Sequence, residues 1–245
     1  MLTAYSAWMA RLLADSNAID MLLVGDSLGM VELGYDSTLP VTMDDMVRYT
    51  RAVRTGAPNA LIVADMPFLS HQLSPAQALR NAGRLIQQGG AAAVKMEGGA
   101  LIAPTVERIV SAGIPVMGHL GLTPQSIHVL GGFRRQAKQP EEQQRLLSDA
   151  AALETAGAFS LVLECVPAEL GRSASQQLRI PVIGIGSGAG CDGQVLVIND
   201  ILGLSGFAPT FAKQYASIGD AISQAVRAFA EEVRSGQFPP AGKEW

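Results

Sequence analysis

Short apolar segments alternate with amphipathic helical patterns along most of the 245-residue chain. The apolar segments are too short and too continuous for amphipathic helices, and they lack the polar alternation of a half-exposed strand. This pattern is typical of parallel strands buried on both faces. The predicted strands are 1–5, 21–24, 61–64, 92–96, 115–118, 161–163, 182–185 and 194–198. The predicted helices between them are 7–17, 43–54, 75–88, 101–112, 141–156 and 168–178, and glycines that could end three of these helices are Gly89, Gly113 and Gly157.

Eight predicted strands in a chain of this length favour a (β/α)₈ barrel, a fold that typically takes about 250 residues. A doubly wound open sheet gives the same alternation, and periodicity alone does not distinguish the two. The sequence has no low-complexity linker and no break in composition. We therefore expect residues 1–245 to form a single (β/α)₈ TIM barrel domain of the α/β class, with a further C-terminal helix over 218–235.

Composition and charge exclude several classes of protein. Hydrophobic residues make up 48% of the chain and charged residues 16%, below the usual share of about 25%. Such a chain can bury a large core and part of its exterior against other subunits. A net charge of −4 without a basic run argues against a nucleic-acid partner. We also expect no membrane partner and a cytoplasmic location, because the sequence has no secretory signal and no apolar run near the roughly 20 residues that span a bilayer.

Polar side chains end five of the predicted strands. They are Asp26 with Ser27, Asp65, Lys95 with Glu97, His119, and Glu164. In a βα barrel the carboxyl ends of all strands open onto one face, so these side chains would converge around one cavity. A single Asp or Ser after a strand commonly caps the next helix. Capping explains this set poorly, because Lys95, His119 and Glu164 are not good capping types.

Three of these residues, Asp26, Asp65 and Glu97, are carboxylates that suit a hard cation, and Mg²⁺ is the natural candidate. Lys95 lies two residues before Glu97, so both side chains would point to the same side of a strand, where Lys95 could neutralise an acidic substrate. His119 fits two roles equally well: a catalytic group, or a histidine hydrogen-bonded at the barrel rim.

Several sequence strings around these residues resemble the ketopantoate hydroxymethyltransferase family. The similarity covers nearly the whole chain in co-linear order. The strings are 23–30 (LVGDSLGM), 34–42 (GYDSTLPVT), 63–68 (VADMPF), 94–99 (VKMEGG), 115–126 (PVMGHLGLTPQS), 163–170 (LECVPAEL), 183–188 (IGIGSG) and 191–194 (CDGQ).

The resemblance implies a barrel of the phosphoenolpyruvate/pyruvate type, a Mg²⁺ ion and a homo-oligomer, usually a decamer. It implies transfer of a one-carbon unit from 5,10-methylenetetrahydrofolate to 3-methyl-2-oxobutanoate through a Mg²⁺-stabilised enolate. The products would be 2-dehydropantoate and tetrahydrofolate, in the first step of pantothenate biosynthesis.

The same resemblance assigns roles to the residues at the strand ends. Asp26, Asp65 and Glu97 fall on the metal positions, and Glu164 falls on the proton acceptor. The keto-acid positions are Asp26, Ser27, Asp65 and Lys95, and we expect His119 to join these substrate-binding residues.

Three departures from the family pattern bear on packing, assembly and folate handling. The sequence starts at the predicted strand 1–5 without the family's usual short leader. Ser6 stands where the family usually has Asp, and residues 136–138 read Gln-Ala-Lys in place of the usual Gln-Gly-Arg.

Two alternatives stay open. One is a carbon–carbon lyase or phosphonomutase on the same barrel, although such lyases usually carry a Lys-Cys-Gly tripeptide and this sequence has none. The other is a non-catalytic relative that only binds a keto acid or serves in assembly. The presence of all five of Asp26, Asp65, Lys95, Glu97 and Glu164 argues against it.

Overall fold

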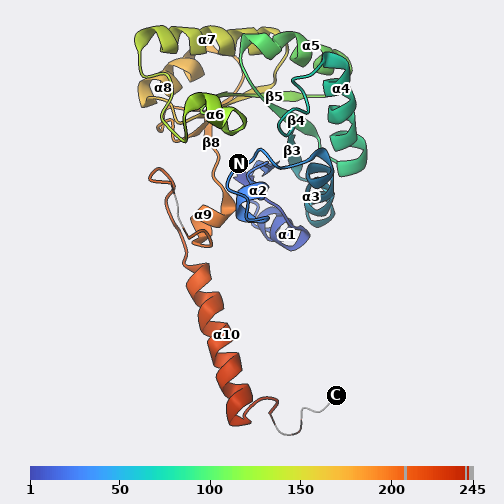
Figure 1. Ribbon diagram of the computed structural model, residues 1–245, viewed down its shortest axis with the longest axis vertical. Helices are drawn as coiled ribbons and strands as arrows, with labels where there is room; N and C mark the ends of the chain where they lie inside the picture. The colour runs from blue at the N-terminus through green and yellow to red at the C-terminus, as the bar shows by residue number, and fades with distance from the viewer. Residues whose placement is uncertain (207–208, 241, 243–245) are drawn as a thin grey trace. The chain divides into compact units, whose positions relative to one another are not determined.

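The computed structural model describes residues 1–206, 209–240 and 242 and contains one eight-stranded parallel sheet (Figure 1). The order of the strands in the sheet follows their order in the chain. The strands are β1 (Leu2–Thr3), β2 (Met21–Val24), β3 (Leu61–Asp65), β4 (Ala93–Glu97), β5 (Val116–Gly121), β6 (Ser160–Glu164), β7 (Val182–Ile185) and β8 (Gly193–Gln194). Trp245, the last residue of the predicted domain, lies outside the described residues.

The two ends of the sheet meet. Leu2 forms an isolated parallel bridge with Leu196, and the backbone N–H of Thr3 donates to the Leu196 carbonyl at 3.2 Å. The sheet is therefore a closed barrel, as predicted, and the open doubly wound alternative is wrong. An open sheet would leave its two edge strands unpaired, whereas here the first and last segments bond to each other.

Seven buried apolar side chains, six of them on strands and the seventh directly after β8, form the inner core of the barrel. These residues are Leu23, Val63, Ala93, Met117, Val162, Ile183 and Val195. Side chains on a strand alternate between its faces, so the residue two positions further along also points inward. On β3 to β6 that next inward layer is polar, and it lies at the carboxyl ends of the strands.

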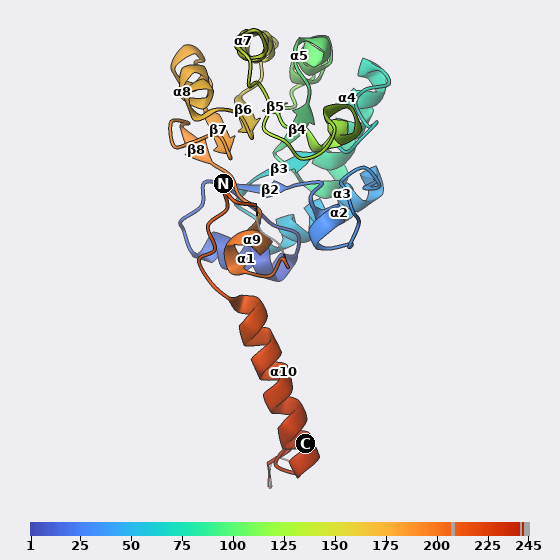
Figure 2. The ribbon, with the colours of Figure 1, turned by 60° about the vertical axis from the view of Figure 1, so that its left-hand side comes forward.

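Helices lie on the outer side of the sheet (Figure 2). The α-helices of this part of the chain are α1 (Ala7–Asp15), α2 (Leu28–Val31), α3 (Met43–Gly56), α4 (Pro75–Arg84), α5 (Ala103–Ser111), α6 (Ile127–Leu130), α7 (Pro140–Thr155) and α8 (Ala168–Gln177). Side-chain caps fix the first turns of some of these helices. Thr42 and Asp45 form a capping box at α3, and Ser6 caps α1 by accepting from the Met9 N–H at 3.3 Å. Ser6 thus performs a role that an Asp could also perform.

Some predicted boundaries were wrong. The predicted helix 75–88 continues through a π-helical turn (Leu85–Gly89), so Gly90, with φ 79°, ends it instead of Gly89. Gly113 and Gly157 do take left-handed conformations, with φ 87° and 93°. The predicted strand 194–198 overlaps β8 only at Gln194, and its last residue, Ile198, begins α9 (Ile198–Leu202), because a run of apolar residues fits the start of a helix as well as a strand.

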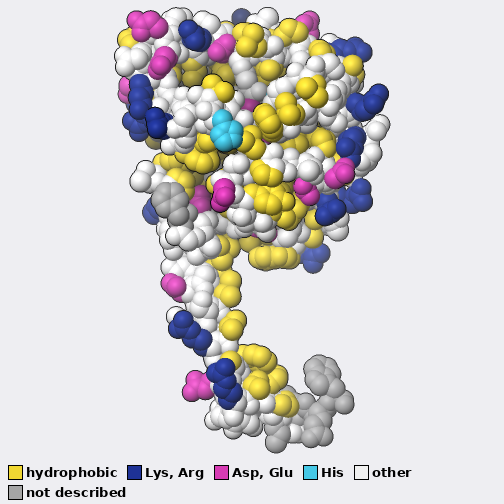
Figure 3. Space-filling model, viewed as in Figure 1, with side chains coloured by type: hydrophobic (Ala, Val, Ile, Leu, Met, Phe, Trp, Pro, Cys, Tyr) yellow, Lys and Arg dark blue, Asp and Glu magenta, His cyan; other side chains and the backbone are white. Residues whose placement is uncertain are grey.

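The chain divides into two compact units, Met1–Val197 and Ile198–Trp245, so the single domain stays a prediction. The second unit contains α9 (Ile198–Leu202) and α10 (Ile218–Ser235). One side of α10 carries apolar side chains, each 38–61% exposed, and charged side chains lie along its other side (Figure 3). The apolar residues are Ile218, Ile222, Val226, Phe229 and Val233. Among the described residues, no helix has both the length and the apolar content needed to cross a bilayer.

Candidate active site

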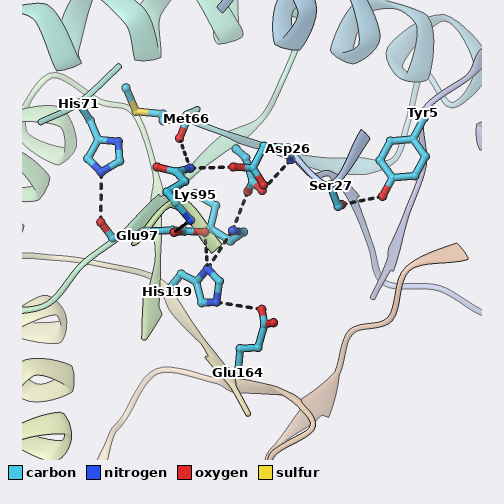
Figure 4. Close-up of polar contacts among 11 residues, drawn as sticks. Tyr5, Asp26, Ser27, Met66, His71, Lys95, Glu97, His119 and Glu164 are labelled. Atoms are coloured by element: carbon cyan, nitrogen blue, oxygen red, sulfur yellow. Dashed lines mark hydrogen bonds and ion pairs between the residues drawn. The ribbon is translucent and has the colours of Figure 1, made fainter. Parts of the chain in front are cut away.

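The polar layer of the barrel brings five predicted site residues together (Figure 4). Asp65, Lys95, Glu97, His119 and Glu164 each lie two or four positions beyond an inward-pointing core residue of their own strand. Asp65 is the register partner of Lys95, and Glu97 is the register partner of His119. The alternation of strand side chains therefore places all five at the mouth of the barrel, as the sequence predicts.

An ion pair joins the ends of β3 and β4. Lys95 Nζ lies 2.9 Å from Asp65 Oδ1, and both side chains are no more than 5% exposed. Burial alone would lower the pKa of Lys95, but the carboxylates of Asp65, Glu97 and Asp26 raise it above its ordinary value. The lysine therefore keeps its charge inside the protein.

The carboxylates around Lys95 outnumber it. The pKa of Asp26 is raised well above its ordinary value by burial and by the neighbouring charges of Asp65 and Glu97. Burial also raises the pKa of Glu97, to about 7. With all three acids ionised, the group with Lys95 carries a formal charge of −2, which one divalent cation would balance. Buried charge without such compensation is costly.

Gln125 cross-links this group, and sequence reasoning missed its role. Its Nε2 donates to Asp26 Oδ2 at 2.8 Å and to the Met66 carbonyl at 2.9 Å, while its backbone N–H donates to Glu97 Oε2 at 3.0 Å. Gln125 lies in a 3₁₀ turn (Pro124–Ser126) just beyond β5. A glutamine in a turn carries no signal of its own, although it falls inside one of the strings that resemble the family.

His119 connects the acidic group to the predicted base. Its Nδ1 lies 3.2 Å from Lys95 Nζ and 3.3 Å from Glu97 Oε1, and its Nε2 lies 3.3 Å from Glu164 Oε2. Burial and the charge of Lys95 lower the pKa of His119, which favours the neutral ring.

Glu164 ends β6 on the more open side of the mouth. Its side chain is 16% exposed, against 3% for that of Glu97. Gly121 allows this strand end to approach β5, because it has φ 90° and a Cβ there would lie 2.2 Å from the Glu164 carbonyl oxygen. The Leu122 N–H donates to that same oxygen at 2.8 Å.

Two further residues contact residues of the site by hydrogen bonds. Tyr5, buried at the end of the first predicted strand, shares a 2.8 Å hydrogen bond with the Ser27 hydroxyl. His71, from the loop after β3, lies with Nε2 3.1 Å from the Glu97 carbonyl oxygen. The one indication of this contact in the sequence is that a buried tyrosine hydroxyl needs a hydrogen-bond partner.

Cys165 follows Glu164 in a left-handed conformation with φ 52°. Burial and the charge of Glu164 raise the pKa of its thiol to about 11. Its carbonyl accepts from the Gln136 N–H at 2.8 Å. Ala137, which follows Gln136, is buried and also has φ 52°. This conformation favours glycine, so it fits the glycine that the family usually has at this position better than it fits alanine.

The donors suit Mg²⁺ in type and charge. Across residues 1–206, 209–240 and 242, no three His, Cys, Asp or Glu side chains converge into a ready-made metal cluster. Mg²⁺ does not require one, because it keeps several waters and commonly binds through only one or two carboxylates. The hard oxygens and excess negative charge of Asp26, Asp65 and Glu97 fit such an ion.

Comparison with known sequences identifies the family. Residues 1–241 match ketopantoate hydroxymethyltransferase. The chain belongs to this family. Among its relatives, the 3-methyl-2-oxobutanoate hydroxymethyltransferase of Syntrophus aciditrophicus is 59% identical, with 98% of this chain and 88% of the relative covered. The enzyme of the same name from Moorella thermoacetica is 58% identical, covering 98% of this chain and 89% of the relative. The resemblance noted in the sequence is confirmed, and membership of the ketopantoate hydroxymethyltransferase family makes the chain a transferase.

Solved structures place this ketopantoate hydroxymethyltransferase family member in a wider fold group. It is similar to 2,3-dimethylmalate lyase, a member of the PEP mutase/isocitrate lyase superfamily (TM-score 0.62, 17% identity, covering 100% of this chain and 83% of the other). It is also similar to phosphonopyruvate hydrolase in complex with oxalate and Mg²⁺ (TM-score 0.63, 12% identity, covering 98% and 84%). At these identities the similarity establishes the barrel fold alone, which is the fold that the sequence predicts.

Proposed function

We propose that this chain transfers a hydroxymethyl group from 5,10-methylenetetrahydrofolate to 3-methyl-2-oxobutanoate, giving 2-dehydropantoate and tetrahydrofolate. The observation that carries the proposal is the pairing, in a member of this family, of a buried charged group with a more exposed carboxylate, Glu164, across His119. A 2-keto acid needs both parts: charge to hold its oxygens, and a base beside its carbon. The relatives' name supports the choice of substrate.

The buried charged group would bind the keto acid. Asp26, Ser27, Asp65 and Lys95 are the residues that would surround its carboxylate and keto oxygens. The Lys95 ammonium, fixed by Asp65 at 2.9 Å and shielded from water, would stabilise negative charge on those oxygens without having to reorganise.

Asp26, Asp65 and Glu97 would hold Mg²⁺ in the same place. When bound, the ion would act as a Lewis acid that offsets the charge growing on the keto oxygen. Phosphonopyruvate hydrolase, which shares the fold, has been solved with oxalate and Mg²⁺, and oxalate is also a small acid with adjacent oxygens.

Glu164 would act as the general base. It would take the proton from C3 of the keto acid, leaving the electron pair of the broken C–H bond on an enolate. C3 would then bond to the methylene carbon carried by the folate, and the bonds from that carbon to the two folate nitrogens would break. Water would supply the hydroxyl, and the remaining water proton and the proton taken by Glu164 would go to the two nitrogens of the departing tetrahydrofolate. The partial exposure of Glu164 suits a group that must reach both substrate and solvent.

The proposal is tested by incubating the purified protein with Mg²⁺, 3-methyl-2-oxobutanoate and 5,10-methylenetetrahydrofolate. We expect 2-dehydropantoate by mass spectrometry, and none when the folate is left out. A folded protein that makes no product would contradict the proposal. Folate-independent cleavage of 2,3-dimethylmalate would instead favour the lyase alternative.

We also infer that the chain forms a homo-oligomer, for which the family resemblance suggests a decamer. The low charged fraction and the exposed apolar side of α10 support self-association. Light scattering at micromolar concentration should report a mass of several chains, and a stable monomer would contradict this inference. The cytoplasmic location stays a prediction.

A further inference from the structure

We propose that His119 is a positioning residue that orients the base Glu164, and that Lys95 determines which nitrogen of its ring carries the hydrogen. The inference rests on the proposed function, because it concerns how the base of that reaction is held. It assigns His119 a role different from the direct substrate contact predicted from the sequence.

The Nδ1 side of the ring faces a group that can only donate. Lys95 Nζ lies 3.2 Å from Nδ1, and a lysine ammonium has three donors and no acceptor. Asp65 Oδ1 lies 2.9 Å from Nζ and accepts from the same ammonium. Nδ1 must therefore accept, and it carries no hydrogen in this arrangement. Glu97 Oε1, 3.3 Å away, gains no hydrogen bond from it.

The Nε2 side of the ring must then carry the hydrogen. Nε2 is shielded from solvent and has no hydrogen-bond partner among the described residues, and Glu164 Oε2, 3.3 Å away, is the acceptor within its reach. A buried N–H without an acceptor is costly, so this geometry draws the carboxylate towards the ring. The distance is long for a hydrogen bond, as is common before substrate binds.

Glu164 needs such a support. It is the last residue of β6 and the most exposed of the five acids and bases at the mouth, so its own strand fixes its backbone but not its carboxylate. Both ring nitrogens of His119 face protein side chains, with Lys95 Nζ 3.2 Å from Nδ1 and Glu164 Oε2 3.3 Å from Nε2. The chain Asp65–Lys95–His119–Glu164 thus runs from the group that would hold the substrate oxygens to the group that would take its proton.

The test compares His119→Gln, His119→Asn and His119→Leu. A Gln amide nitrogen can reach the place of Nε2, whereas an Asn amide reaches only the place of Nδ1, and Leu fills space without donating. The rate to measure is exchange of the keto acid's C3 proton with deuterated solvent, followed by NMR with Mg²⁺ and without folate. Keto-acid affinity is measured separately by calorimetry.

We expect the exchange rate of the Asn and Leu variants to fall by about 10–100-fold, the range typical of residues that orient the groups of an active site. The Gln variant should recover most of that loss. All three should bind the keto acid as the wild type does. His128→Gln, at an exposed histidine in α6, is the matched control and should exchange at the wild-type rate.

Three results would overturn the inference. Rescue by Asn but not Gln would show that the Nδ1 contact matters instead. Equal losses in all three variants together with weaker keto-acid binding would make His119 a substrate ligand. Wild-type exchange in all three would remove it from the reaction. If the His119→Leu variant does not fold, the comparison of the Gln and Asn variants still tests the inference. Absence of exchange in the wild type itself would contradict the proposed function, and with it the base that His119 would serve.

Discussion

The acids at the ends of β2 to β4 and the acid at the end of β6 are of the same chemical kind but are held in different ways. Asp26, Asp65 and Glu97 are buried, and each contacts at least one donor from the protein. Glu164 is several times more exposed than these acids, and its carboxylate lies 3.3 Å from His119 Nε2. Environments that differ in this way separate the roles of identical groups. The first set is suited to holding charge in place, and the second to moving a proton.

Glu164→Gln should give the largest effect on the reaction, and it tests the role of the more exposed carboxylate. The variant keeps every buried carboxylate, so it should still bind Mg²⁺ and 3-methyl-2-oxobutanoate. Loss of a general base typically costs about 10²–10⁴ in rate, which we expect in C3 proton exchange measured by NMR. Exchange at the wild-type rate would show that Glu164 is not the base.

Asp65→Asn and Glu97→Gln test the role of the buried carboxylates. Each removes one negative charge with little change in volume, so both variants should stay folded. We expect calorimetry to show Mg²⁺ affinity reduced on the order of tenfold or more, with most of the turnover lost, because supporting residues alone can cost that much. Glu107→Gln, at an exposed acid on α5, is the control. Unchanged Mg²⁺ affinity in both variants would make these carboxylates purely structural.

The raised pKa of Glu97 predicts a pH dependence of stability in the absence of Mg²⁺. Its pKa rises from 4.5 to about 7 on folding, so the folded state holds the proton more tightly than the unfolded state. The stabilisation is therefore complete below about 4.5 and is lost as the pH rises towards about 7. Since other groups titrate as well, the quantity to measure is the free energy of unfolding of the wild type relative to Glu97→Gln. A difference that does not fall over this range would contradict the prediction.

Gln125→Leu should give the smallest effect, and it tests whether the buried acids depend on neutral donors. The change leaves the Met66 carbonyl and Asp26 Oδ2 without the amide hydrogens that they accept. An unsatisfied buried group costs about 1–3 kcal/mol, so thermal unfolding should occur at a lower temperature. Gln72→Leu removes the 3.3 Å contact to Gln125 and the 3.2 Å hydrogen bond from the His71 N–H to Gln72 Oε1, but it leaves Asp26 and the Met66 carbonyl with their donors, so it serves as the milder comparison. Equal stability of the wild type and Gln125→Leu would show that the cross-link contributes nothing.

The strand ends were predictable and the turns were not. Asp65, Lys95, Glu97, His119 and Glu164 lie on strands, where alternation and the common direction of parallel strands determine what faces the cavity. Gln125 and His71 lie in a turn and a loop, where no periodicity relates sequence position to direction. The carboxylates themselves indicated Mg²⁺, whereas the family resemblance supplied the folate and the role of Glu164 as the base. Spacing alone could not have shown that His119 lies between Lys95 and Glu164.

Cys165 has a practical consequence for the chemistry of this protein. With a pKa of about 11, only about one thiol in 10⁴ is ionised at neutral pH, and the thiolate is the form that reacts with alkylating agents and oxidants. Burial likewise raises the pKa of Cys191. A cysteine introduced at an exposed position should therefore take up a fluorescent or spin label well before either natural thiol. Labelling can then proceed without first removing the cysteine next to Glu164.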